Sequence, residues 1–221
     1  MLLYYITDRS QFPGGEDARR RTLLDKIAEA AQAGVDYIQL REKDLSAREL
    51  EQLAREAVGA VRQARSAAGN RLPATALLIN SRTDIALAAG ADGVHLRSDD
   101  ISPRDARLAV SHAGHRPLTT GHFVVAVSCH SPSEVARAEK EGADFAVFAP
   151  VFEKKAVPGT QAQGLAALAE ACKAKIPVFA LGGITLENAQ SCLEAGAAGV
   201  AGIRMFQENR IGEVVQALRV L

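Results

Sequence analysis

The amino-acid sequence predicts a single-domain (β/α)8 barrel over residues 1–221, and three observations support this prediction. First, four similar stretches recur, each with a helix-like end, a glycine and an apolar run. Their glycines lie 52 to 56 residues apart, at Gly34, Gly90, Gly142 and Gly196. Second, a βα unit needs roughly 25 to 30 residues, so each period holds two units and the chain holds eight. Third, apolar runs of strand length alternate with helical patterns.

The strands are expected where the apolar runs lie. In chain order they are residues 2–7, 36–40, 76–80, 93–96, 123–128, 145–148, 177–181 and 199–203. Most runs are continuously apolar rather than alternating, as expected for parallel strands covered on both faces. An open doubly wound sheet is the alternative. It is disfavoured because the glycines after the first strand, in "ITDRSQFPGGED", lack the G-x-G-x-x-G spacing.

Capping residues indicate where the helices begin. The predicted starts are Ser46, with Glu49 in a capping box; Ser102, followed by Pro103; Ser131, followed by Pro132 and with Glu134 in a second box; and Thr185. The repeated glycines are expected to end helices in the left-handed conformation, which glycine adopts without steric cost.

Composition restricts the function classes. The 26 basic residues balance the 26 acidic ones, so nothing indicates nucleic acid or a membrane surface as partner. No apolar run is long enough to span a membrane, and the start lacks the features of a secretory signal. Cys129, Cys172 and Cys192 have no metal-ligand spacing, and we expect Cys129 to be a small buried residue rather than a nucleophile. We therefore expect a cytoplasmic protein with reduced thiols, whose homo-oligomeric state stays open.

Polar residues follow the predicted strands, at the edge where barrels of this kind carry their chemistry. Gln39, Arg41 and Lys43 follow the second strand and have the same parity, so on an extended segment they face the same way. A guanidinium beside an ammonium suits phosphate or diphosphate oxygens. Asp100, after the fourth strand, is a candidate to bring a hard cation such as Mg²⁺ to those phosphates. A solvated loop is the alternative, and the convergence of eight such strand ends favours a site.

Glycines near the last two strands indicate a second anion. Gly182 and Gly183 follow the seventh strand, and Ile203 and Arg204 end the eighth. This fits the phosphate cradle common in barrels, where glycine lets backbone N–H groups approach an anion. A tight turn is the alternative for the glycine pair. The residues alone thus predict a barrel enzyme with one or two phosphorylated ligands.

Seven stretches together resemble the thiamine-phosphate synthase and thiazole tautomerase superfamily along essentially the whole chain. They are "YYITDR", "YIQLREKD", "LLINSR", "GADGVHL" with "DD" after it, "VSCHS", "GADFAVFAPVF" and "LGGITLEN". Each alone is weak, and their order and spacing make the resemblance specific. The resemblance implies a (β/α)8 synthase that joins hydroxymethylpyrimidine diphosphate to thiazole phosphate and releases pyrophosphate. It also implies small phosphorylated pyrimidine and thiazole substrates and Mg²⁺ as cofactor.

The resemblance implies roles for individual residues. Pyrimidine diphosphate contacts match Gln39, Arg41, Lys43, Asn80 and Ser128. The thiazole phosphate pocket matches Gly183 and Ile203, with Gly182 and Arg204 beside them. Asp100 matches one of two metal carboxylates.

Four positions depart from the synthase pattern. Ser81 stands where the second metal carboxylate is usual, and a neutral hydroxyl there should weaken Mg²⁺ binding. After the sixth strand, "EKKAVPG" replaces a Thr-x-Thr-Lys segment, so the catalytic lysine candidate, Lys155, is displaced. Arg97 and Arg204 stand where a glycine and a serine are usual. They either supply the lost cationic contacts or form ion pairs.

Alternative functions stay open. A thiazole tautomerase, which isomerises a thiazole carboxylate phosphate, would use His130 for proton transfer, because a neutral imidazole suits that task. A non-catalytic binder of phosphate ligands in thiamine metabolism would need only the retained anion contacts. A phosphosugar epimerase is disfavoured by "LREKD" and "SCHS". Among the other histidines, we expect His95 to be a satisfied interior residue, and His112, His115 and His122 to be exposed.

Overall fold

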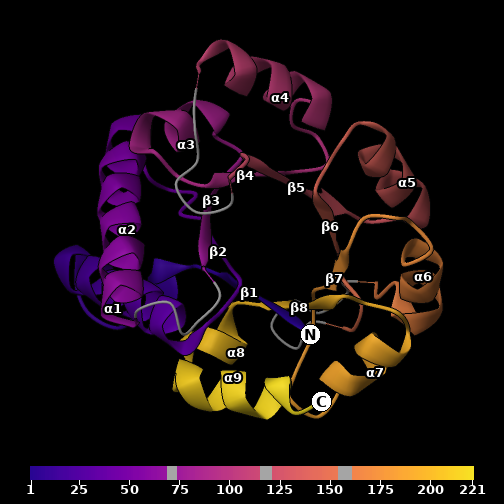
Figure 1. Ribbon diagram of the computed structural model, residues 1–221. Helices are drawn as coiled ribbons and strands as arrows, with labels where there is room; N and C mark the ends of the chain where they lie inside the picture. Colours follow the sequence, from indigo (N-terminus) through magenta and orange to yellow (C-terminus); the bar gives the residue numbers. More distant parts are fainter. Residues whose placement is uncertain (69–73, 115–120, 154–160) are drawn as a thin grey trace.

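The strands form a closed parallel barrel, seen along its axis in Figure 1. The computed structural model describes residues 1–68, 74–114, 121–153 and 161–221. The strands are β1 (Leu2–Ile6), β2 (Tyr37–Leu40), β3 (Ala76–Asn80), β4 (Gly93–Leu96), β5 (Val124–Cys129), β6 (Phe145–Phe148), β7 (Val178–Ala180) and β8 (Gly199–Gly202). Each strand pairs with the next in sequence, and β8 pairs with β1. This confirms the predicted (β/α)8 barrel, with every predicted strand boundary within one residue of the observed one.

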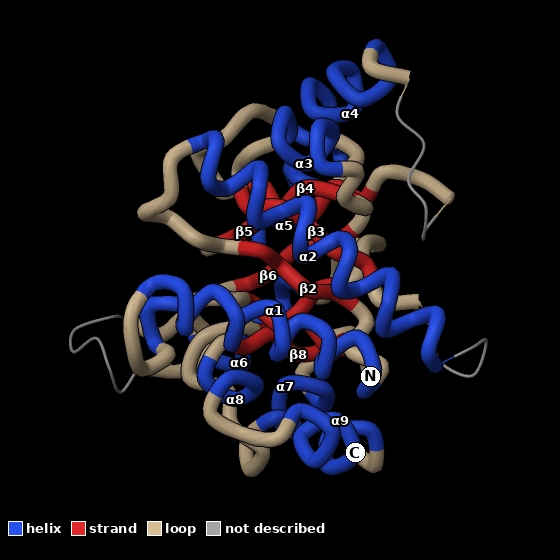
Figure 2. The backbone as a smooth tube through the Cα atoms, turned by 90° about the vertical axis from the view of Figure 1, so that its left-hand side faces the viewer, coloured by secondary structure: helices blue, strands red, loops and turns tan. Residues whose placement is uncertain are grey.

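Helices cover the outside of the barrel between successive strands (Figures 1 and 2). They are α1 (Glu16–Ala33), α2 (Ala47–Ala68), α3 (Thr83–Ala89), α4 (Pro103–His112), α5 (Pro132–Lys140), α6 (Gly164–Ala171), α7 (Ala189–Glu194), α8 (Arg204–Gln207) and α9 (Ile211–Arg219), with a 3-10 helix, η1 (Arg9–Gln11), after β1. Within the described residues, no helix combines the length and the apolar character needed to cross a membrane.

The two predicted capping boxes differ in outcome. Before α2, the Glu49 carboxylate accepts the N–H of Ser46 at 2.9 Å, and Ser46 Oγ accepts the N–H of Glu49 at 3.4 Å, as expected. Before α5, Ser131 Oγ accepts the N–H of Glu134 at 3.2 Å, but the Glu134 carboxylate accepts the N–H of His130 at 2.6 Å. The second capping box is therefore wrong in one of its two hydrogen bonds, because the Glu134 carboxylate binds the N–H of His130 instead of that of Ser131. Glu134 thus fixes the end of β5.

One predicted helix start is confirmed and one is wrong. Ser102 caps α4, where its Oγ accepts the N–H of Asp105 at 3.1 Å. The start predicted at Thr185 is wrong, because α7 begins at Ala189. The N–H of Thr185 donates to Asn188 Oδ1 at 2.8 Å, so the residues between them form a turn before the helix begins.

The repeated glycines adopt the predicted left-handed conformation. The φ angles of Gly34, Gly90, Gly142 and Gly196 are 81°, 69°, 84° and 98°. A side chain would be strained in this region, so the periodic glycines end helices and turn the chain toward the next strand.

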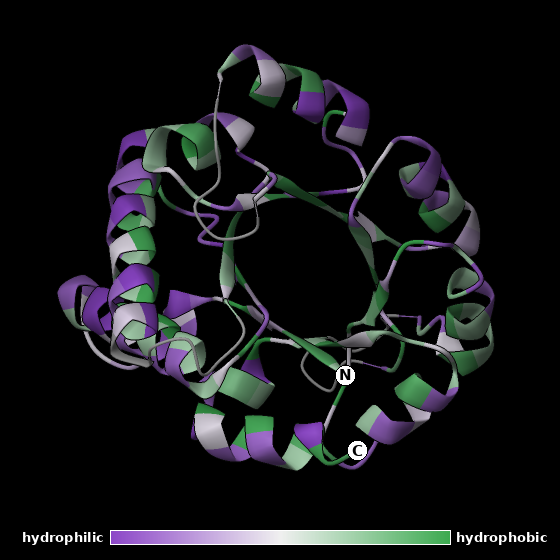
Figure 3. Ribbon diagram, viewed as in Figure 1, coloured by the Kyte–Doolittle hydropathy of each residue, from purple (hydrophilic) through white to green (hydrophobic). Residues whose placement is uncertain are grey.

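An aromatic layer fills the barrel near the N-terminal ends of its strands. The ring of Tyr4 lies 5.9 Å from that of Tyr37, 5.6 Å from that of Phe145 and 5.7 Å from that of Phe179, centroid to centroid. A second, larger apolar layer joins the strands to the helices, whose outer faces are hydrophilic (Figure 3). Because Tyr37 and Phe145 begin their strands, the polar side chains are left to the C-terminal half of the barrel.

Candidate active site

A buried hydrogen-bonded chain leads from the aromatic layer toward the C-terminal rim. The Tyr4 hydroxyl lies 2.8 Å from His95 Nδ1, and His95 Nε2 lies 2.7 Å from Ser128 Oγ. His95 is 1% exposed, and burial lowers its pKa to about 3. The imidazole is therefore neutral near pH 7, with one nitrogen donating and the other accepting. This confirms the predicted interior histidine and places half-buried Ser128 at the outer end of the chain.

A second polar chain joins β2 to β3. Gln39 Nε2 donates to Asn80 Oδ1 at 2.8 Å, and Asn80 Nδ2 donates to Ser81 Oγ at 3.1 Å. Gln39 is 2% exposed, so this chain is buried at its β2 end. Ser81 has a φ of 61°, a region that non-glycine residues rarely occupy, and its N–H donates to the His95 carbonyl at 2.8 Å. Such backbone strain is typical of functional sites.

Arg41 is a half-buried cation without a carboxylate partner. Its backbone N–H donates to Thr7 Oγ1 at 3.0 Å, but its guanidinium forms no hydrogen bond or ion pair with any described residue. Burial lowers the pKa of this guanidinium, which nevertheless stays protonated near pH 7. Asp8 and Glu42 oppose this shift from nearby, but neither pairs with the guanidinium directly, so the group is suited to an anionic ligand.

The charged residues of "QLREKD" lie beyond the end of β2. The strand ends at Leu40, and Lys43 lies exposed in a turn, so strand parity does not fix its direction relative to Arg41. The carboxylates of Glu42 and Asp44 both bind Arg9, and Asp44 lies in the turn that leads into α2.

Arg9 and Gln207 are the buried polar residues near the rim that the sequence analysis missed. Arg9 is 3% exposed and forms ion pairs with Glu16, Glu42 and Asp44. Gln207, on α8, accepts the N–H of Asp8 at 2.7 Å and donates to the carbonyl of Asp8 at 3.0 Å. The two hydrogen bonds between Gln207 and Asp8 join the end of β1 to the segment after β8. Neither pattern is visible in a local stretch of sequence.

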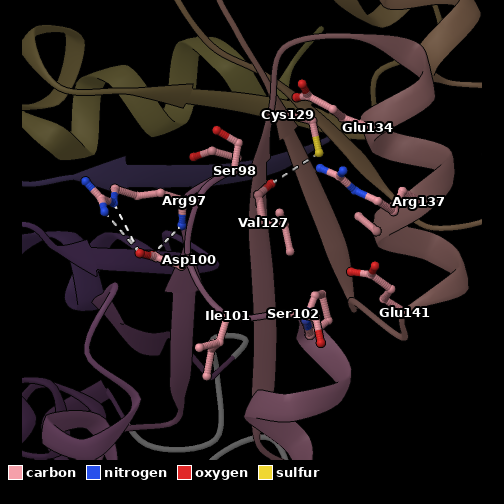
Figure 4. A pocket seen from close by; sticks show the side chains of 13 residues that line it. Arg97, Ser98, Asp100, Ile101, Ser102, Val127, Cys129, Glu134, Arg137 and Glu141 are labelled. Atoms are coloured by element: carbon pink, nitrogen blue, oxygen red, sulfur yellow. Dashed lines mark hydrogen bonds and ion pairs between the residues drawn. The ribbon is translucent and has the colours of Figure 1, made fainter.

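Asp100 and Ser128 line one pocket of about 220 Å³ between the loop after β4 and α5 (Figure 4). The Asp100 carboxylate accepts the N–H of Arg97 at 2.7 Å and pairs with its guanidinium at 3.2 Å. Arg97 also pairs with Asp99 at 3.3 Å, so the ion-pair alternative holds for Arg97. Exposed Arg204, at the start of α8, has no ion-pair partner among the described residues.

Gly182 and Gly183 allow the segments after β6 and β7 to approach closely. Their φ angles are 98° and 66°. A Cβ at Gly182 would lie 2.7 Å from the Cβ of Pro150, and one at Gly183 would lie 2.6 Å from the Glu153 carbonyl oxygen. The N–H of Phe152 donates to the Gly182 carbonyl at 3.0 Å. Gly182 and Gly183 thus have a structural role, because they let the segments after β6 and β7 pack against each other.

The remaining candidates are placed as follows. His130 is exposed after β5, and its Nδ1 lies 2.7 Å from the Ala149 carbonyl oxygen. Half-buried Ile203 precedes α8. Lys155 and His115 lie outside the described residues. His112 and His122 are exposed, and Cys129 is buried with its pKa raised to about 12 by burial, as expected for residues without a catalytic role.

Nearly the whole chain matches one known family. The model of that family, described as thiamine monophosphate synthase, matches residues 3–206. The chain belongs to this family. The match confirms the superfamily that the sequence resembles and, with it, the predicted transferase of thiamine biosynthesis.

Individual relatives align with this chain over almost its whole length. A thiamine-phosphate synthase of Methanoculleus marisnigri is 37% identical over 99% of this chain and 92% of its own. One of Syntrophomonas wolfei is 37% identical over 91% of this chain and 86% of its own. The structure of thiamine phosphate pyrophosphorylase from Pyrococcus furiosus is similar with a TM-score of 0.76 and 28% identity, covering 99% of this chain and 94% of that one.

Proposed function

We propose that this protein joins hydroxymethylpyrimidine diphosphate to thiazole phosphate, forming thiamine phosphate and releasing pyrophosphate. In this reaction the bond between the pyrimidine methylene carbon and the diphosphate oxygen breaks, and the thiazole nitrogen forms a bond to that carbon. The observation that carries the proposal is Arg41, a half-buried guanidinium at the rim with no carboxylate partner among the described residues. An incoming diphosphate would supply the direct ion pair that the Arg41 guanidinium lacks among the described residues.

The residues around Arg41 are suited to the rest of the pyrimidine substrate. Lys43 adds an exposed ammonium from the same turn, and Ser128 offers a hydroxyl to a phosphate oxygen. The linked amides of Gln39 and Asn80 supply both donors and acceptors, which match the polar edge of an aminopyrimidine. Positive charge aimed at the departing pyrophosphate stabilises the charge that develops as the bond breaks.

The opposite part of the rim is suited to the thiazole phosphate. Gly182 and Gly183 follow β7 in the left-handed conformation, and Ile203 and Arg204 follow β8. Arg204 has no ion-pair partner among the described residues and so is available to a phosphate. This arrangement agrees with the common phosphate site of barrels, formed after their last two strands.

Mg²⁺ fits the site as a cation shared with the substrate. In the part of the chain that the structure describes, no three acidic, histidine or cysteine side chains are grouped to hold a metal by themselves. Mg²⁺ commonly uses one or two carboxylates together with substrate phosphates, so we infer that the Asp100 carboxylate and the Ser81 hydroxyl would hold it, Asp100 in place of its present pair with Arg97. When bound, it would neutralise developing phosphate charge. We also infer a cytoplasmic location, supported by three cysteines without disulfide bonds.

A tautomerase is the second candidate, favoured by His130. Because a carbonyl oxygen only accepts, the contact with Ala149 places a proton on His130 Nδ1 and leaves Nε2 as the basic nitrogen of the neutral ring. A base so oriented is suited to moving a proton on a bound thiazole.

Two assays with the purified protein separate these functions. One supplies both synthase substrates with Mg²⁺ and measures thiamine phosphate; the other supplies the thiazole carboxylate phosphate tautomer and measures isomerisation. Thiamine phosphate formation supports the synthase. No product at high enzyme concentration, with isomerisation that His130→Ala abolishes, would support the tautomerase instead.

A further inference from the structure

Arg9, itself buried, is at the centre of an ion-pair cluster beside the "QLREKD" turn, in which Glu42 is buried and Glu16 and Asp44 are exposed. Its Nη1 lies 2.7 Å and its Nη2 2.9 Å from the two Asp44 carboxylate oxygens, in a bidentate pair. Nη1 also lies 3.1 Å from Glu42 Oε2, and the backbone N–H of Arg9 donates to the same oxygen at 3.0 Å. The Nε group donates to Glu16 at 2.6 Å. Every side-chain nitrogen of Arg9 is thus bound to a carboxylate.

Thr7 links this cluster to the backbone of Arg41. Thr7 Oγ1 donates to Glu42 Oε1 at 2.6 Å and accepts the N–H of Arg41 at 3.0 Å. Glu42 is 6% exposed and Thr7 is fully buried, so these bonds form out of water, where they are stronger. Thr7 therefore fixes the backbone at Arg41, and Arg9 fixes the side chain of Asp44. The chain is thus held on both sides of residue 42.

The charges of the cluster matter for an anionic ligand. Glu42 and Asp44 alternate with Arg41 and Lys43 along the chain, so each cation has an acidic neighbour. The hydrogen bond with Arg9 lowers the pKa of Asp44, and burial raises the pKa of Glu42 while its bonds to Thr7 and Arg9 oppose that rise. Arg9 engages both carboxylates, and the guanidinium of Arg41 stays unpaired with any described residue.

We propose that Arg9 is a positioning residue for the substrate's diphosphate group. By binding Glu42 and Asp44, it fixes the turn over residues 41–44 and holds both carboxylates in hydrogen bonds of its own, so that neither forms an ion pair with the Arg41 guanidinium. This inference rests on the proposed function, because it needs a diphosphate at the rim. Arg9 itself is buried and has no role in contacting the ligand.

Asp44→Asn is the sharpest test, because two explanations predict opposite signs. Asp44 is 68% exposed at its side chain, so the variant is expected to fold. If Asp44 were only a nearby negative charge, its removal would strengthen diphosphate binding. If it anchors the turn to Arg9, its removal weakens binding, by about tenfold, the change that ~1.4 kcal/mol produces. Arg9→Lys, which keeps the charge and loses the bidentate geometry, should act in the same direction.

Steady-state kinetics and calorimetry with inorganic pyrophosphate measure the effect. We expect both variants to raise KM for the pyrimidine diphosphate and Kd for pyrophosphate together, while KM for the thiazole phosphate is unchanged. Glu56→Gln is the matched control, since it removes a bidentate pair with Arg20, between α1 and α2, and should change neither constant.

An unchanged or lower Kd for pyrophosphate in Asp44→Asn overturns the inference. Loss of kcat with both KM values unchanged also overturns it, because a merely structural ion pair reduces only the amount of folded enzyme. If the unaltered protein makes no thiamine phosphate but binds pyrophosphate, the proposed function fails and the calorimetric comparison alone decides the role of Arg9. If it does not bind pyrophosphate, both proposals fall.

Discussion

The buried neutral state of His95 should make the protein sensitive to mild acid. In the unfolded chain a histidine takes up a proton below its ordinary pKa of about 6.5. In the folded protein His95 is 1% exposed, and burial lowers its pKa to about 3. Between these values the unfolded state binds one more proton than the folded state, so the free energy of unfolding falls as the pH is lowered.

The magnitude follows from the width of this pH window. Each pH unit inside it costs ~1.4 kcal/mol, so lowering the pH from about 7 to about 5 should remove about 2 kcal/mol through His95 alone. His95→Gln keeps polar groups beside Tyr4 and Ser128 but does not titrate. The variant should therefore lack this part of the acid destabilisation, whatever its stability at pH 7.

Urea unfolding at several pH values, followed by circular dichroism, measures the difference. The exposed His112, His122 and His130 are present in both proteins, so their contributions cancel. The quantity to compare is the change in unfolding free energy with pH, not its absolute value. If the unfolding free energies of the two proteins fall equally between pH 7 and pH 5, the conclusion that His95 is neutral in the folded protein is refuted.

Three further predictions concern other parts of the rim. Gly182→Ala should destabilise the protein by about 1–3 kcal/mol in urea unfolding, because φ is 98° and the new Cβ would lie 2.7 Å from Pro150. Gly59→Ala is the control and should not destabilise it, because no atom lies within 4 Å of the Cβ that would be added there. Ser81→Asp should lower the Mg²⁺ concentration for half-maximal rate by roughly tenfold, since aspartate tolerates the left-handed backbone, and an unchanged Mg²⁺ titration contradicts this. The thiol of Cys129, whose pKa burial raises to about 12, should resist iodoacetamide until the protein unfolds; equal labelling rates with and without urea would count against it.

The sequence predicts those parts of the fold that depend on local patterns. The apolar runs give the strands because burial on both faces of a parallel sheet requires continuous apolar residues. The periodic glycines predict where helices end, because the residue after a helix often needs a positive φ that glycine adopts most easily, as at Gly34 and Gly196. The gathering of polar residues at one rim follows from the parallel barrel itself, so Gln39 and Arg41 were predicted from position, whereas Asn80 and Ser128 were implied by the family resemblance.

What the sequence did not predict concerns contacts made across the fold and the local geometry where strands end and helices begin. Arg9 binds Glu42 and Asp44, which lie 33 and 35 residues away in sequence, so no local pattern indicates the cluster. Lys43 was assigned a direction from strand parity, which ends with the strand at Leu40. The start of α7 was placed at Thr185 because a capping residue was recognised, but the Asn188 side chain binds the Thr185 N–H and holds a turn there.

The rate of thiamine phosphate formation by Arg41→Gln tests the central claim most directly, namely that the rim binds and activates a diphosphate. Arg55→Gln is the control, since this exposed arginine lies on α2 and pairs only with Glu51 among the described residues. We expect the unaltered protein and Arg55→Gln to form product at the same rate, and Arg41→Gln to lose about 100-fold in kcat/KM. Equal rates for Arg41→Gln and the unaltered protein, or no product from the unaltered protein, would contradict the claim.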